Sequence, residues 1–193
     1  MPPRLTFQSC AAAAETLAGS DEDAPPPAFR DDFVAAMGQV PSSVAVVTTG
    51  ASGGHLALTV GTFISVSADP PMVLVSVKRR APLCEAVLAN RAYAVSVLAA
   101  GQAEHADRFA GRPRSGRAYD LAAAQWSAPN AGLHPFLDGA VACFGCELEH
   151  AQPVATHVLL IGRVTHVRAQ RHTPLVYWSR AYAKPAAQSA DLG

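Results

Sequence analysis

The sequence predicts a mainly β fold, in which an antiparallel barrel, closed or partly closed, carries a few short helices. Six or seven strands are expected, with residues 56–67 counted as one strand that bends at Gly61, and most of them follow one another directly along the chain. The regular alternation of strands and helices that builds a doubly wound parallel sheet is missing. The chain has 193 residues, half of them hydrophobic, which fits one domain with a substantial core.

Charge and hydropathy exclude several classes of partner. Lys and Arg together number 15, as do Asp and Glu, so a large basic face is not expected and nucleic acid is an unsuitable partner. No apolar run reaches the ~18 residues of a membrane span, and no basic segment followed by a continuous apolar one opens the chain. We therefore expect a soluble, cytoplasmic protein without a membrane partner.

The N-terminal part is expected to form an arm, one helix and four strands. Residues 1–27, rich in Ala and Pro, show no sustained period and predict a disordered or loosely attached arm. A short amphipathic helix follows, because apolar residues recur at helical spacing; they are Phe29, Phe33, Met37 and Val40. Strand character occurs at residues 44–49, 56–62, 63–67 and 72–77.

Turn signals separate these four strands. Residues 50–54 (GASGG) predict a turn, and Asp69-Pro70-Pro71 ends the third strand. Gly61 predicts a bend between the second and third strands, since a glycine inside a strand often marks a close approach of the backbone.

The second half of the domain is expected to contain two helices and four strands. Helices are predicted at residues 82–88 and 102–109, and strands at 93–98, 140–149, 156–167 and 175–178. Residues 112–134 are polar and irregular, as in a functional or mobile loop. The domain is expected to span residues 28–184, followed by a flexible tail at 185–193.

Cysteine and histidine spacing does not predict a metal site. Cys143 and Cys146 form a C-F-G-C motif, but no second such pair exists and the motif lies inside an apolar run, which favours two small buried side chains over zinc or redox chemistry. The histidines form no H-x-x-x-H pair.

Several of these segments together resemble the flavin reductase-like family, whose fold is the FMN-binding split barrel. They are VPSSVAVVTTG, LALTVGTFISVSADPPMVLVSVKRR, YAVSVLAAGQAEHADRFAGR, FLDGAVACFGCELEH and ATHVLLIGRVTHVRA followed by PLVYW. The resemblance covers about residues 29–182. It implies a split antiparallel β-barrel and a homodimer with FMN or FAD near the subunit interface. It also implies NADH or NADPH as the reductant, and a flavin-dependent monooxygenase as the partner that receives the reduced flavin.

The stretch LTVGTFISVSADPP is the first candidate cofactor site. Gly61 would let the backbone approach the polar edge of an isoalloxazine ring, and short hydroxyls and apolar side chains would surround it. The hydroxyls are those of Thr59, Thr62 and Ser65, and the apolar side chains are Val60 and Phe63. The alternative is that the hydroxyls only occupy the solvent face of an antiparallel strand.

The second candidate is the turn that follows the fourth strand, which would hold the flavin phosphate. Its residues are Val77, Lys78, Arg79 and Arg80, directly before a predicted helix start. Similar reductases commonly have hydroxyl side chains in this turn, whereas this chain has Ala81 and Leu83. Either the cationic residues compensate, or flavin binding is loose or lost. An exposed basic loop is the alternative reading.

Three further residues are candidates because of the resemblance. It places Phe109 against the cofactor and Arg112 near its phosphate, although a helix C-terminus explains the same RFAGR pattern. It places His157 near the nicotinamide as the catalytic residue. The family often has Gly-Asp-His there, whereas this chain has Ala155-Thr156-His157, so we expect the imidazole tautomer to be less firmly fixed. Tyr177 and Tyr182 would close the pocket or simply pack.

The function predicted from these features is an NAD(P)H-dependent flavin reductase. Hydride would pass from the nicotinamide to a flavin stacked against it, with positioning as the protein's main contribution. Two alternatives stay open at this stage: a split-barrel enzyme with tightly held FMN that performs another redox reaction, and a non-catalytic flavin-binding or scaffold relative.

Overall fold

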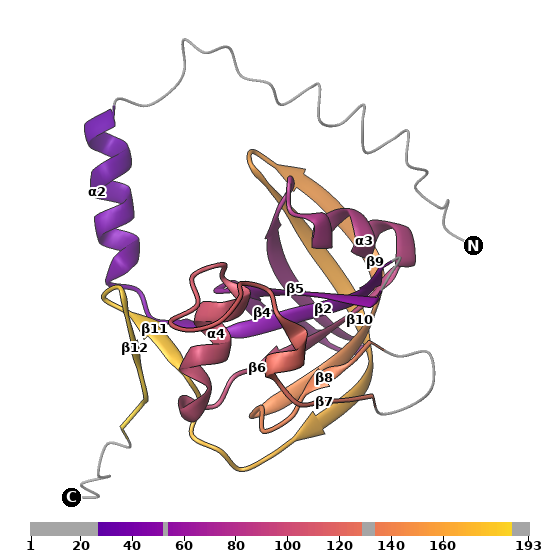
Figure 1. Ribbon diagram of the computed structural model, residues 1–193. Coiled ribbons are helices and arrows are strands. Elements are labelled where there is room, and N and C mark those ends of the chain that lie inside the picture. The colour runs from indigo at the N-terminus through magenta and orange to yellow at the C-terminus, as the bar shows by residue number, and fades with distance from the viewer. Residues whose placement is uncertain (1–26, 52–53, 129–133, 187–193) are drawn as a thin grey trace, which may run out of the picture.

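The structure, a computed structural model, describes residues 27–51, 54–128 and 134–186 (Figure 1). It confirms the predicted mainly β fold, with an open rather than closed antiparallel barrel. The predicted arm and tail lie almost entirely outside the described residues, so these domain limits remain predictions.

One antiparallel sheet of seven strands forms the body of the molecule. Its strand order is β3-β2-β6-β9-β10-β5-β4, so three of the six neighbouring pairs join strands that are not consecutive in the chain: β2–β6, β6–β9 and β10–β5. The strands are β2 (Ala45–Ala51), β3 (Gly54–Val60), β4 (Phe63–Ala68), β5 (Pro71–Lys78), β6 (Ala92–Val97), β9 (Ala142–Val154) and β10 (His157–Ala169). The two edge strands, β3 and β4, are consecutive in the chain but do not pair, which leaves the barrel split between them.

The helix α3 (Pro82–Asn90) fills the inside of the curved sheet. Its buried residues Leu83, Cys84 and Val87 pack with the inward-facing valines of β2, β5 and β6. Figure 1 shows α3 beside the long β9–β10 hairpin. Because α3 directly follows β5, this packing fixes the turn between them, which contains the predicted phosphate residues.

The opposite face of β2 and β3 is covered by a second set of helices. These are η2 (Ala100–Gln102), α4 (Ala103–Phe109) and η3 (Leu121–Ala123). Phe109 is completely buried here, with its ring centroid 5.5 Å from that of Trp126. A separate core cluster therefore forms between α4 and the sheet.

The edge strand β4 is irregular and exposed. Ser65 pairs with Val73 and Ser67 with Met72, so Val66 forms a bulge. Bulges on edge strands oppose unwanted pairing. Ile64 and Val66 are 53% and 50% exposed, which leaves two large apolar side chains in solvent.

A small three-stranded sheet connects the chain ends of the described region. It comprises β1 (Ser42–Ser43), β11 (Val176–Trp178) and β12 (Ala181–Ala183), in the order β1-β11-β12. Ser179 and Arg180 both have positive φ, as a two-residue hairpin turn requires. Ser179 N donates to Gly38 O, which ties this hairpin to the end of α2 (Pro27–Gly38).

The helix α2 stands away from the body in Figure 1. All of its large apolar side chains are exposed, including Phe29, Phe33 and Met37, the residues that predicted an amphipathic helix. The helix itself is confirmed, beginning two residues earlier than expected. Within the described part of the chain, its apolar side has nothing to pack against.

Several local predictions were incomplete. The predicted loop at residues 112–134 contains η3 and β7 (Trp126–Ser127), and β7 pairs with β8 (Phe136–Leu137). Strand β9 runs to Val154 instead of ending at residue 149. Cys143 and Cys146 are free, buried thiols in different core clusters, as the packing interpretation predicts. No helix among the described residues is long and apolar enough to cross a membrane.

Candidate functional site

Three of the predicted site segments meet at one end of the large sheet. His157, the first residue of β10, pairs with Lys78, the last residue of β5. Arg79 N donates to Thr156 O at 3.0 Å, which continues this pairing into the cationic turn. On the other side of β5, Phe63 pairs with Val75, so the same register places Gly61 at the level of Val77.

The backbone at Gly61 and Thr62 is accessible at this end. Both residues are exposed and lie in the bend between β3 and β4, as predicted. A Cβ atom built on Gly61 would meet only Ser42 Oγ, at an ordinary contact distance of 3.5 Å, so there is room beside the glycine. In the part of the chain that the structure describes, the hydroxyls of Thr62 and Ser65 have no hydrogen-bond partner, and they are free to bind a polar ring edge.

Other residues of the same stretch have structural roles. Thr59 Oγ1 donates to Ala106 O at 2.8 Å, so this hydroxyl anchors α4 and its proton is not available to a ligand. Val60 and Val77 are buried in the core, and only their backbone atoms remain for a ligand. The ring of Phe63 is half-buried, with its centroid 5.2 Å from that of Phe144. The predicted apolar contacts of Val60 are therefore corrected, because alternation along β3 points this side chain inward.

The cationic turn has the character of an anion site. Lys78, Arg79 and Arg80 are all exposed. Ala81 is the N-cap of α3 and supplies no side-chain hydrogen bond. In the first turn Pro82 has no amide hydrogen and Cys84 N donates to Ala81 O at 2.9 Å, so the turn lacks a side-chain cap but offers few free amides. An uncapped helix N-terminus next to cationic side chains suits a phosphate, whereas Glu85 in the first turn opposes it. Leu83 is buried in the core, so packing explains the absence of a hydroxyl there.

His157 has a local partner that the sequence interpretation overlooked. Thr156 Oγ1 lies 2.9 Å from His157 Nδ1, so a hydroxyl stands where an acid was expected to orient the ring. With Nδ1 engaged by this hydroxyl, Nε2 is the ring nitrogen left for a ligand. The side chain is half-buried at the start of β10.

Phe109 and Arg112 are not part of the group formed by the Gly61 bend, the cationic turn and His157. Phe109 has no exposed surface, so the expected contact of its ring with a cofactor is corrected to a core role between α4 and Trp126. Its neighbour Arg108 is also buried and binds Glu104 Oε1 and Arg117 O. Arg112 is exposed and lines a separate pocket, described next.

This pocket, of about 520 Å³, lies between the end of α4 and the β11–β12 hairpin. Arg112, Arg114 and Arg180 line it together with Tyr177 and Tyr182. Tyr182 Oη donates to Asp107 Oδ1 at 2.8 Å, and Arg114 Nε donates to Asp107 Oδ2 at the same distance. Arg114 and Arg180 carry no local sequence signal, because only the hairpin turn and the α4 loop bring them to Arg112.

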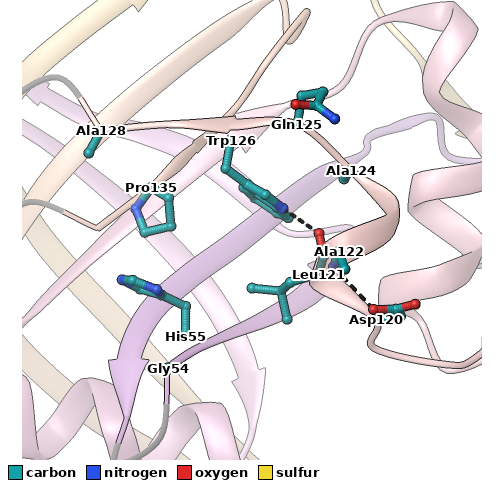
Figure 2. A pocket seen from close by; sticks show the side chains of 10 residues that line it. All are labelled: Gly54, His55, Asp120, Leu121, Ala122, Ala124, Gln125, Trp126, Ala128 and Pro135. Atoms are coloured by element: carbon teal, nitrogen blue, oxygen red, sulfur yellow. Dashed lines mark hydrogen bonds between the residues drawn. The ribbon is translucent and has the colours of Figure 1, made fainter.

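A larger cavity, of about 760 Å³, lies at the opposite end of β3 (Figure 2). His55, Leu121, Trp126 and Pro135 surround it, and Trp126 Nε1 donates to Leu121 O at 2.8 Å. None of the predicted site residues lines this cavity.

Metal-ligating side chains do not cluster at either place. Across the described residues, no group of three His, Cys, Asp or Glu side chains has a geometry that could hold a metal ion.

Comparison with known proteins agrees with this geometry. The family model described as flavin reductase like domain matches residues 37–186. The NADH-dependent FMN reductase AsuE2 of Streptomyces nodosus subsp. asukaensis is 37% identical over 172 residues, covering 88% of this chain and 92% of that protein.

Two solved structures extend the likeness to three dimensions. One is the NADH:FAD oxidoreductase SgcE6 of Streptomyces globisporus, in complex with NAD and FAD fragments; it has a TM-score of 0.74 and 28% identity, with 88% of this chain and 99% of that chain covered. The other is the styrene monooxygenase flavin reductase SMOB of Pseudomonas putida S12, with a TM-score of 0.71, 30% identity, and coverage of 81% and 99%.

Proposed function

The chain belongs to the flavin reductase-like family, and we propose that it is an NADH-dependent enzyme that reduces FMN or FAD for use by a second protein. The observation that carries this proposal is the gathering of the Gly61 bend, the cationic turn and His157 at one end of the sheet. Curated relatives that act on FMN with NADH, and a structural neighbour complexed with NAD and FAD fragments, support it.

The residues present fit a flavin mononucleotide group. Lys78, Arg79 and Arg80, with the uncapped start of α3, would hold its phosphate. The backbone and hydroxyl of Thr62 would bind the polar edge of its ring beside Gly61. The flavin supplies the hydride acceptor, and the protein supplies binding and orientation.

His157 is the side chain proposed to act at the reacting end. Because Thr156 engages Nδ1, the Nε2 atom would face the bound nicotinamide or the flavin edge and donate or accept a hydrogen bond there. This proposed contact with the reacting groups would make His157 a catalytic residue.

Release of the reduced flavin implies a partner. SMOB is the flavin reductase of a styrene monooxygenase, and BorF is that of a two-component tryptophan halogenase. We propose that a flavin-dependent monooxygenase receives the flavin here.

We also propose that the chain acts as a homodimer and that it works in the cytoplasm, where NADH is regenerated. The exposed apolar residues of α2 and β4 support the dimer.

NADH oxidation, followed optically with and without added flavin, tests the function. We expect colourless protein that oxidises NADH only when FMN or FAD is added. Riboflavin, which lacks the phosphate, should have a KM about ten-fold higher or more, since charge-assisted hydrogen bonds to phosphate are lost. The double variant Lys78→Ala/Arg80→Ala should raise the KM for FMN similarly and leave that for riboflavin unchanged.

The matched control is Arg171→Ala, which removes an exposed charge from the loop after β10 and should change neither KM. Protein that is yellow after purification would instead indicate a tightly held group. Absence of turnover with all three flavins at high concentration would overturn the proposal.

A further inference from the structure

We propose that the pocket between α4 and the β11–β12 hairpin binds an adenosine diphosphate group, the half that NADH and FAD have in common. The proposal rests on the proposed function, because that function brings a dinucleotide to this chain. No residue of the turn at 78–81 lines this pocket. With the flavin phosphate at that turn, FAD would reach the pocket with its adenosine-side phosphate and adenosine, and NADH with its whole ADP group.

The charge of the pocket suits a diphosphate. Arg114 is neutralised in part by Asp107, to which its Nε donates at 2.8 Å. The guanidinium groups of Arg112 and Arg180, in contrast, have no ion-pair partner in the described part of the chain. Two unpaired guanidinium groups at one small pocket favour an anion with several oxygen atoms, because each can make two parallel hydrogen bonds to phosphate.

The aromatic side of the pocket is held in a fixed position. The rings of Tyr177 and Tyr182 meet edge to face with centroids 5.6 Å apart. Tyr182 Oη donates to Asp107, whose other oxygen is bound by Arg114, so three side chains form one connected unit. Burial and the Asp107 hydrogen bond raise the pKa of Tyr182 to about 12, and the phenol therefore remains a donor at neutral pH. A rigid aromatic wall beside two free cations suits a purine joined to phosphates.

The location links the pocket to the flavin site. Tyr177 pairs with Ser42 across β11 and β1, and Ser42 Oγ is the atom closest to a Cβ built on Gly61. A single residue pair therefore separates the pocket from the bend proposed to hold the flavin ring. A dinucleotide whose nicotinamide or flavin lies at Gly61 can place its other half here.

Binding of ADP, measured by calorimetry, tests the site without relying on activity. Wild-type protein should bind ADP, and should bind adenosine about ten-fold more weakly or worse, since the phosphates carry the charge. The variant Arg112→Ala/Arg180→Ala should weaken ADP binding by about ten-fold or more. It should leave FMN binding unchanged, because FMN has no adenosine half and its phosphate is proposed to lie at the turn 78–81. Arg171→Ala is the matched loss of an exposed cation and should bind ADP normally.

The KM values of the double variant for FAD, FMN and NADH identify which dinucleotide binds in the pocket. If the double variant raises the KM for FAD but not for FMN, with NADH unaffected, FAD is the source. If it raises the KM for NADH with either flavin, NADH is the source. Absence of ADP binding by the wild type, or equal binding by the double variant, overturns the inference. ADP binding by a protein without reductase activity would refute the proposed function and leave this site standing.

Discussion

At the scale of single residues, His134 joins two distant parts of the fold. Its Nδ1 atom accepts a hydrogen bond from Gly50 N at 2.9 Å, and Nε2 lies 3.4 Å from Thr49 Oγ1. Burial, and then the nearby charge of His55, lower the pKa of His134 below its ordinary value of 6.5, while a backbone hydrogen bond at Ala92 opposes the shift. The neutral ring therefore belongs to the folded state.

This residue predicts a loss of stability in mild acid. The unfolded chain takes up the proton at its ordinary pKa and the folded chain only at a lower pH, so the unfolded state binds more protons. Above about pH 7.5, His134 therefore does not lower the free energy of unfolding. This free energy falls as the pH drops through about 6.5 and below. Urea unfolding at several pH values measures this fall. The free energy of unfolding should fall less with decreasing pH in His134→Gln than in the wild type. His172→Gln, in an exposed loop, should show the same fall as the wild type.

Gly162 predicts a steric effect at one position of β10. A Cβ atom here would lie 2.5 Å from Tyr93 Oη and 3.0 Å from Cys146 Cβ, so the backbone approaches the β6–β9 layer too closely for a side chain. We expect Gly162→Ala to lower the free energy of unfolding by about 1–3 kcal/mol, as overpacked cores do. Gly101→Ala, which meets no atom within 4 Å, should change it by less than about 0.5 kcal/mol in the same unfolding measurement.

At the scale of elements, the bend between β3 and β4 predicts a separation of stability from binding. Gly61 does not have a positive φ, and an added Cβ would meet one neighbour at an ordinary contact distance, so Gly61→Ala should keep the free energy of unfolding within about 1 kcal/mol. The added methyl group stands where the flavin edge is proposed to approach the backbone. FMN binding, measured by fluorescence quenching, should weaken about ten-fold. Unchanged FMN binding would remove the bend from the proposed site.

Elements of ordinary length were predictable from local pattern, and very short ones were not. Every long strand had a period or a β-branched run, whereas β1, β7, β8 and β12 have two or three residues, too few to show a period. Strand β9 continued through Pro153 because, beyond Glu147, it pairs with β10 only. A proline on a strand with one open side loses no ladder hydrogen bond.

At the scale of the whole molecule, the apolar residues on α2 and β4 predict a dimer. Phe33 is 58% exposed on a helix that packs against none of the other described residues, and Ile64 is 53% exposed on an unpaired sheet edge. Monomers seldom leave so many large apolar side chains together in water. Light scattering should give the mass of two chains for the wild type and of one chain for Phe33→Glu/Met37→Glu, whereas Asp32→Asn, on the same helix, should remain dimeric.

The arrangement of the molecule was predictable only in part. The strand order brings β10 between β9 and β5, and no local pattern encodes such long-range pairing; the resemblance to a known family supplied it. Backbone and charge patterns named Gly61, Lys78 and His157, which the structure brings to one end of the sheet, and their roles there stay predictions. The candidate site was missed where tertiary packing decides, as in the burial of Phe109 and the convergence of Arg180 with Arg112.

The buried thiols provide a built-in chemical probe of this fold. Cys84, Cys143 and Cys146 are all inaccessible, and burial raises the pKa of Cys146 to about 12, so almost none of it is the reactive thiolate at neutral pH. Alkylating reagents should leave these three side chains unmodified until the β-sheet opens. The rate of labelling, measured by mass spectrometry, therefore reports how often the native state opens. Added FMN should lower this labelling rate.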